Sequence, residues 1–150
     1  RVVSELPPQP LAALERAGAR IAAPVEPAGA PRRGVVHLYL AGEWHEVTLP
    51  TSPDGTVVDN LDHALVERVM LGQAWGLAPG DKRITYVGGD YPVSWLRGEV
   101  DAGRAAAAVV IAPVAVDDFV AVNLARQKMP RKSTWFTPKA RAGLVLAELG

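Results

Sequence analysis

The sequence predicts an α+β fold, in which a mixed β-sheet with one hairpin carries helices packed on it in a single domain. Two β-rich runs flank the short turn Ala41-Gly42, an arrangement typical of a hairpin. An unbroken apolar run over residues 105–112 is typical of a central strand buried on both faces. Strands are expected at residues 35–40, 43–49, 84–87, 105–112 and 144–147, and helices after Asn60, Asp90 and Asp117.

The chain is expected to have two parts. Residues 1–33 are predicted to hold a strand, a helix and a proline-rich linker, and residues 34–150 the α+β domain. Arg1-Val2-Val3 is β-branched and resembles the end of a strand. Pro10 begins a helix that ends at Gly18. Because the chain opens on strand-like residues and not on methionine, we expect it to be a fragment of a longer protein.

The hairpin carries two of the three histidines, His37 and His45, one on each strand. A metal site needs more ligands than two histidines on a ribbon, and the chain has no cysteine to add. We therefore expect both to be half-exposed strand residues, and we predict no metal site.

The helix after the hairpin is expected to be capped by Asp59 or Asn60. Glu67 and Arg68 are predicted on its outer face, and His63 in its first turn has no predicted partner. The residues predicted to face the core recur at helical spacing, and they are Leu61, Leu65, Val69 and Met70.

A glycine pair, Gly88-Gly89, separates the strand at residues 84–87 from the helix that Asp90 begins. A strand, a glycine-rich turn and a helix also form phosphate-binding loops. However, the wider glycine fingerprint and a following Lys-Ser or Lys-Thr are missing here. We interpret the pair as a turn, with an anion site as the alternative.

The composition limits the possible functions. Lys plus Arg and Asp plus Glu both number 16, so the broad basic face of a dedicated nucleic-acid-binding protein is not expected. The absence of cysteine excludes disulfides and thiolate metal sites, and it is compatible with the cytoplasm. No apolar run is long enough to span a bilayer, and no signal-peptide pattern is present. We expect a cytoplasmic protein without membrane contacts.

Positive charge is concentrated near the C-terminus. No Asp or Glu lies between Asp118 and Glu148. The six cationic residues of this stretch are Arg126, Lys128, Arg131, Lys132, Lys139 and Arg141. Pro130 and Pro138 fix the backbone φ angle at two points, so the segment between them is expected to be a fixed loop or an edge strand.

Two hydroxyl groups in this loop, on Ser133 and Thr134, follow the Lys132 ammonium. This combination suits a phosphate or carboxylate oxygen. We predict an anion-binding site formed by Lys132, Ser133, Thr134 and Lys139. The alternative is a solvated basic loop that Trp135-Phe136 anchors to the core.

The same segment resembles a known family signature. Met129-Pro130, the run Lys132-Ser133-Thr134-Trp135-Phe136, Pro138-Lys139 and Gly143-Leu144-Val145 are similar to the C-terminal motif of bacterial and archaeal proteins catalogued as domain of unknown function 1015. Arg131 stands where that family usually has a second proline. Other segments of the chain resemble the family more weakly, and they occur in the order that the family shows, so the resemblance covers nearly the whole chain. Longer members resemble, upstream, the ParB and sulfiredoxin group, which includes partition proteins and free-serine kinases. This chain lacks that group's Asp-Gly-His-His-Arg motif.

Two function classes follow. In the first, the chain is the accessory C-terminal half of a protein that handles a small phosphorylated ligand, such as a small-molecule kinase, with its main catalytic groups in an upstream domain. In the second, it is a non-catalytic interaction or structural module whose loop docks on that upstream domain. Lys132 and Ser133 buried against a carboxylate would favour the second class. The residues leave the reaction and any cofactor open.

Overall fold

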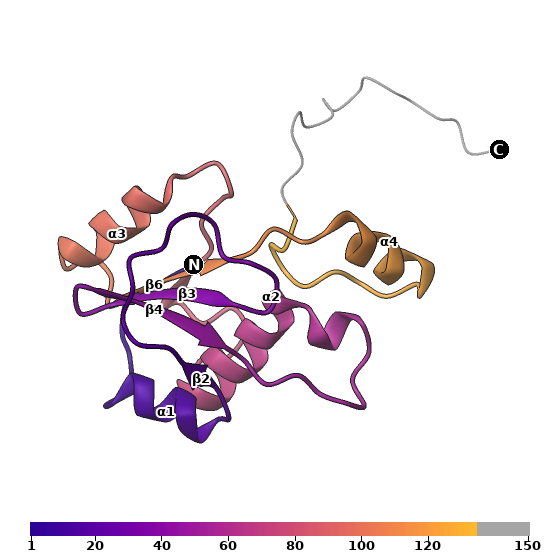
Figure 1. The fold of residues 1–150 in the computed structure, drawn as a ribbon, viewed down its shortest axis with the longest axis horizontal. Coiled ribbons are helices and arrows are strands. Elements are labelled where there is room, and N and C mark those ends of the chain that lie inside the picture. Colours follow the sequence, from indigo (N-terminus) through magenta and orange to yellow (C-terminus); the bar gives the residue numbers. More distant parts are fainter. Residues whose placement is uncertain (135–150) are drawn as a thin grey trace.

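The computed structural model describes residues 1–134, and these form a six-stranded sheet with helices on both faces (Figure 1). The α+β single-domain class is thus confirmed. Lys139, Trp135, Phe136 and the expected strand at 144–147 lie outside the described residues. The strands are β1 (Val2–Val3), β2 (Arg20–Ile21), β3 (Val36–Leu40), β4 (Glu43–Thr48), β5 (Ile84–Thr85) and β6 (Ala107–Ile111). The helices are α1 (Pro10–Arg16), the 3₁₀ turn η1 (Val58–Asn60), α2 (Asp62–Leu65), the π-helix η2 (Val66–Ala74), α3 (Val93–Asp101) and α4 (Val116–Leu124).

The strand order is β2-β4-β3-β6-β1-β5, and every pairing between the described strands is antiparallel. The sequence predicts a mixed sheet, and this detail is wrong, because the described strands pair only in the antiparallel sense. Strand direction follows from the tertiary path of the chain, which the spacing of apolar residues does not encode. β6 lies between β3 and β1, so its predicted interior position is confirmed. β1 lies between β6 and β5, which places the first residues of the chain inside the sheet.

The β3–β4 hairpin is confirmed, with Tyr39 opposite Trp44 and their rings 4.8 Å apart. Ala41 and Gly42 have φ angles of 51° and 87°. A two-residue turn with positive φ at both positions matches the twist of the strands that it joins.

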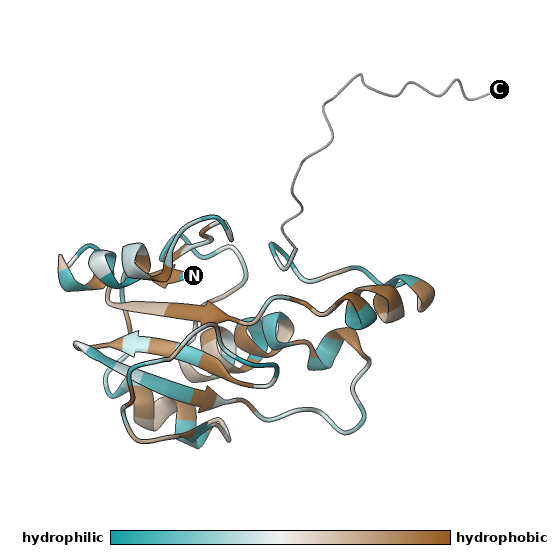
Figure 2. Cartoon of the chain, turned by 45° about the horizontal axis from the view of Figure 1, so that its top comes forward, coloured by the Kyte–Doolittle hydropathy of each residue, from teal (hydrophilic) through white to brown (hydrophobic). Residues whose placement is uncertain are grey.

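Side chains alternate between two cores because successive strand residues face opposite sides of the sheet. Leu38 and Val109 face the larger core, which α1 and η2 cover. Tyr39 and Ala108 face the smaller core, which Leu96 of α3 covers. The predicted core residues of the helix after Asn60 are all buried, and they are Leu61, Leu65, Val69 and Met70. Hydrophobic residues run along β6 and alternate with polar residues along β3, whereas β4 is mostly hydrophilic (Figure 2).

The sequence predicts that the last described helix, α4, packs on the sheet, and this prediction is wrong. It projects beyond the end of β6 (Figure 1). Val116 and Leu124 are 76% and 80% exposed. An ion pair joins the helix to the linker, with Arg33 Nη2 2.9 Å from Asp118 Oδ1.

Two predictions for the first half of the chain are wrong in detail. Asp59 and Asn60 do not cap α2, because their side chains close the preceding loop through bonds to Thr56 and Ser52. Glu67 is not on the outer face, because its carboxylate binds the buried Arg1 side chain.

The hairpin histidines are also placed differently from the prediction. His37 and His45 are each only 6% exposed, not half-exposed. Burial lowers the pKa of His37, and the neighbouring Glu46 carboxylate partly offsets this shift. Packing on both faces of the sheet covers positions that an isolated ribbon would leave open.

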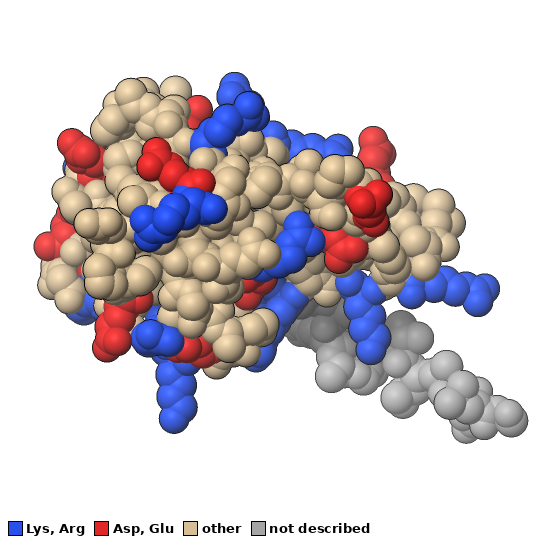
Figure 3. All heavy atoms as spheres, turned by 90° about the horizontal axis from the view of Figure 1, so that it is seen from below, with Lys and Arg blue, Asp and Glu red and all other residues tan. Residues whose placement is uncertain are grey.

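The surface of residues 1–134 carries both charge signs interspersed on the face that Figure 3 shows. Within these residues, no helix is both long and apolar enough to cross a bilayer.

Candidate anion-binding cavity

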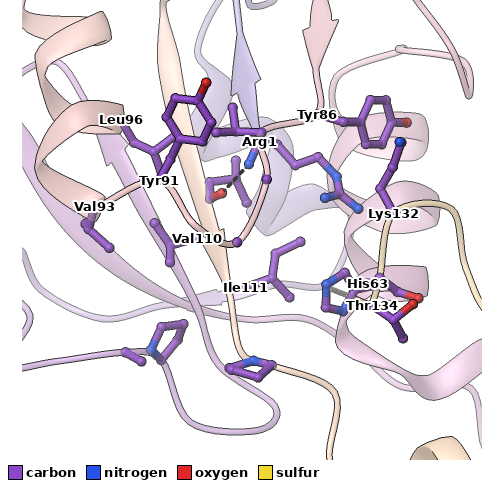
Figure 4. A pocket seen from close by; sticks show the side chains of 18 residues that line it. Arg1, His63, Tyr86, Tyr91, Val93, Leu96, Val110, Ile111, Lys132 and Thr134 are labelled. Atoms are coloured by element: carbon purple, nitrogen blue, oxygen red, sulfur yellow. Dashed lines mark hydrogen bonds between the residues drawn. The ribbon is translucent and has the colours of Figure 1, made fainter. Parts of the chain in front are cut away.

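A cavity of about 350 Å³ lies where several distant segments of the chain meet (Figure 4). Arg1 comes from the start of the chain, His63 from α2, Tyr86 and Gly88-Gly89 from the loop after β5, and Lys132 to Thr134 from the loop after α4. Its size is at the lower end of the range for small-molecule sites. The structure thus brings three predicted anion-binding residues, Lys132, Ser133 and Thr134, into the wall of one cavity.

The loop that carries these residues is shaped by a local turn. The Ser133 hydroxyl donates to the carbonyl of Pro130 at 2.7 Å, and the Ser133 backbone N–H donates to the same oxygen at 3.3 Å. Lys132 takes a left-handed φ of 54° at the corner of this turn. Ser133 is buried, and its hydroxyl proton is already directed at a carbonyl. Its main effect is therefore to orient its neighbours, Lys132 and Thr134, which are exposed.

The side chains of Lys132 and Thr134 line the cavity and are exposed. Among residues 1–134, neither side chain forms a hydrogen bond, and the Lys132 ammonium forms no ion pair. In Figure 4 both are drawn on the side of the cavity toward which the Arg1 guanidinium points. An ammonium group without a carboxylate partner beside a cavity is available to an anionic ligand.

The Arg1 side chain is held by a buried polar network. Its Nε lies 3.2 Å from Glu67 Oε1, and its Nη2 donates to the carbonyl of Arg131 at 3.3 Å. The Tyr86 hydroxyl donates to Glu67 Oε2 at 3.0 Å. Because both carboxylate oxygens have donors, the Glu67 charge is compensated inside the network. Burial, followed by the Glu67 carboxylate, raises the pKa of Tyr86.

His63 is the second buried polar group at the cavity. It is 7% exposed, and its ring forms no hydrogen bond to any of the described residues. Burial first, and then the positive charge of the Arg1 side chain, lower its pKa to about 4. At pH 7 the ring is therefore neutral and offers one N–H donor and one acceptor. Because His63 lines the cavity and its ring nitrogens have no hydrogen-bond partner among residues 1–134, both can reach a ligand there.

The glycine pair is a turn, as interpreted from the sequence. The Tyr91 backbone N–H donates to the Gly88 carbonyl at 3.3 Å, and both glycines line the cavity. The alternative interpretation of the pair as part of an anion site therefore concerns the same cavity as Lys132.

A second cavity of about 600 Å³ adjoins the first and shares Gly89, Pro113, Ser133 and Thr134 with it. The remainder of its lining is apolar and comes largely from α4.

Reasoning from the sequence found the Lys132 loop but missed Arg1, His63 and Tyr86. His63 and Glu67 are four residues apart, which places them on one face of a helix. This spacing could have indicated that His63 and Glu67 belong to one polar cluster. The part played by Arg1 has no local signal, because Glu67 lies 66 positions away. Lys139, the fourth predicted residue, is outside the described part of the chain.

The cavity offers a ligand cationic groups, a hydroxyl and one imidazole. In the described part of the chain no carboxylate lines it, and no group of three or more His, Asp or Glu residues is suited to a metal ion. No protein-family model, curated protein or solved structure matches the chain. The resemblance to the domain of unknown function 1015 family therefore stays a prediction from the motifs.

Proposed function

We propose that this chain binds a small phosphorylated ligand in the cavity between Lys132 and Arg1, as the accessory half of a larger phosphate-handling protein. The observation that carries the proposal is the gathering of Lys132, Thr134, Arg1 and His63 around one cavity without a lining carboxylate among residues 1–134. Ammonium, guanidinium, hydroxyl and neutral imidazole groups are all donors to phosphate oxygens.

The electrostatic balance of the site supports an anion. Arg1 shares its charge with Glu67, whereas Lys132 has no ion-pair partner in the described residues. His63 is neutral at pH 7 and adds no charge, so the uncompensated Lys132 ammonium makes the net charge of the described lining positive. An incoming phosphate dianion gains a charge-assisted bond from Lys132 without displacing a carboxylate.

The alternative, a non-catalytic module whose loop only docks, makes a different demand on the same residues. Burial of Lys132 and Ser133 against a carboxylate would favour it. Lys132 is exposed, and the partner of Ser133 is the carbonyl of Pro130. These contacts favour the ligand-binding class over the docking class.

Calorimetric titration of glycerol 1-phosphate tests the proposal. Lys132→Ala is expected to weaken binding by about 1.5–3 kcal/mol, the range for a hydrogen bond to a charged group. Lys128→Ala is the matched control, because Lys128 is exposed in the same segment and does not line the cavity. The proposal fails if glycerol 1-phosphate, inorganic phosphate and phenyl phosphate all give no heat of binding to the wild type, or if Lys132→Ala and Lys128→Ala lose affinity equally.

A further inference from the structure

The cavity has two chemically different sides. Arg1, His63, Lys132 and Thr134 supply the polar side. Figure 4 shows Tyr91, Val93 and Leu96 across the cavity from Lys132 and Thr134. Val110 and Ile111 continue this apolar surface along the end of β6. A ligand that fills the whole cavity must therefore present an anionic end to one side and an apolar end to the other.

We infer that the phosphorylated ligand is a monoester whose second half is a single aromatic or otherwise apolar ring. This inference rests on the proposed function and names the class of ligand that the site selects. The phosphate would lie against Lys132 and Thr134, and the ring against Tyr91, Val93 and Ile111.

The apolar side of the cavity exposes hydrophobic side chains to water. Tyr91 is 50% exposed and Val93 is 42% exposed, both where α3 begins. The Tyr91 ring packs on Trp95 with the ring centroids 4.8 Å apart, so it is held in place. Covering these side chains with a ring removes apolar surface from water, which favours binding.

The cavity also discriminates against ligands rich in hydroxyl groups. A sugar phosphate or glycerol phosphate would place hydroxyls against Val93, Val110 and Ile111, whose side chains offer no hydrogen bond. Burying a hydroxyl that loses its hydrogen bonds to water and gains no new partner costs binding free energy, whereas an apolar ring has no such hydrogen bonds. The volume of about 350 Å³ favours one ring over a dinucleotide.

The test compares three ligands by calorimetry at one pH and one ionic strength: inorganic phosphate, glycerol 1-phosphate and phenyl phosphate. Phenyl phosphate is expected to bind about tenfold or more tightly than glycerol 1-phosphate. Val93→Ser should reduce this ratio severalfold. Val57→Ser is the matched control, because Val57 is 43% exposed and does not line the cavity.

The outcomes separate the inference from the proposed function. If none of the three compounds binds, the proposed function fails and the inference fails with it. If glycerol 1-phosphate and phenyl phosphate bind equally and Lys132→Ala weakens both, only the inference is overturned. The inference also fails if the preference for phenyl phosphate survives in both Val93→Ser and Tyr91→Ala, because the ring then lies elsewhere.

Discussion

The Arg1 guanidinium lies over the ring of Tyr86, 4.5 Å from the ring centroid, and both residues bind the same carboxylate, that of Glu67. The Arg131 guanidinium lies 5.6 Å from the same ring centroid. A cation over an aromatic face is attracted by the ring quadrupole, and more strongly where water is excluded. These contacts connect Arg1 to η2, to the residue that follows β5 and to the loop that carries Lys132.

Removing the Glu67 charge is expected to destabilise the fold strongly. Glu67→Gln leaves the buried Arg1 guanidinium without a counter-ion, and breaking a buried pair in this way costs about 3 kcal/mol. Tyr86→Phe is the milder comparison, since it keeps the ring under Arg1 and loses only a hydrogen bond, worth about 1 kcal/mol. Urea denaturation of both variants measures the two costs. Equal, small losses would mean that the Arg1–Glu67 pair contributes little.

His63 should make the fold sensitive to acid. Its pKa is about 4 in the folded chain, against 6.5 for the free side chain. The unfolded chain therefore binds more protons between these pH values, so this stability is complete above about pH 6.5 and is lost as the pH falls toward 4. The difference corresponds to about 3 kcal/mol. Between pH 7 and 4, His63→Gln should lose about that much less stability than the wild type in denaturant titrations. Parallel pH profiles for the two proteins would contradict this expectation.

The hairpin turn offers a stabilising substitution. Ala41 occupies a left-handed conformation, with φ at 51°, that costs a residue with a Cβ about 1 kcal/mol. Asparagine tolerates this conformation, and Asn-Gly is a preferred pair for a two-residue hairpin turn. Ala41→Asn is expected to raise the free energy of unfolding by about 0.5–1 kcal/mol. Thermal denaturation gives the sign, and a lower melting temperature would count against the turn geometry.

Local patterns in the sequence predict much of this fold. The hairpin around Ala41-Gly42 and the interior strand at residues 105–112 are both present, because turn chemistry and an unbroken apolar run are local signals. The position of β1 between β6 and β5 could not be predicted in this way. Val2 and Val3 pair with residues more than 80 positions away, and such pairing depends on the whole chain.

The candidate site shows the same division. Lys132, Ser133 and Thr134 are adjacent in the chain, so their chemistry can be recognised in the sequence. The approach of His63 and Arg1 to them depends on how α2 and β1 are placed in the fold. A polar site assembled from distant segments becomes visible only in three dimensions.

Ligand binding at this cavity should take up a proton through His63. Burial and the positive charge of Arg1 keep the His63 ring neutral. A phosphate bound beside the ring adds negative charge, which favours the protonated form and raises the pKa of His63. Near pH 5, binding of phenyl phosphate to the wild type should therefore take up as much as one proton more than binding to His63→Gln. Calorimetry in two buffers with different ionisation enthalpies measures this difference and subtracts the titration of the ligand itself. Equal proton uptake by the two proteins, with binding intact in both, would show that the phosphate lies away from His63.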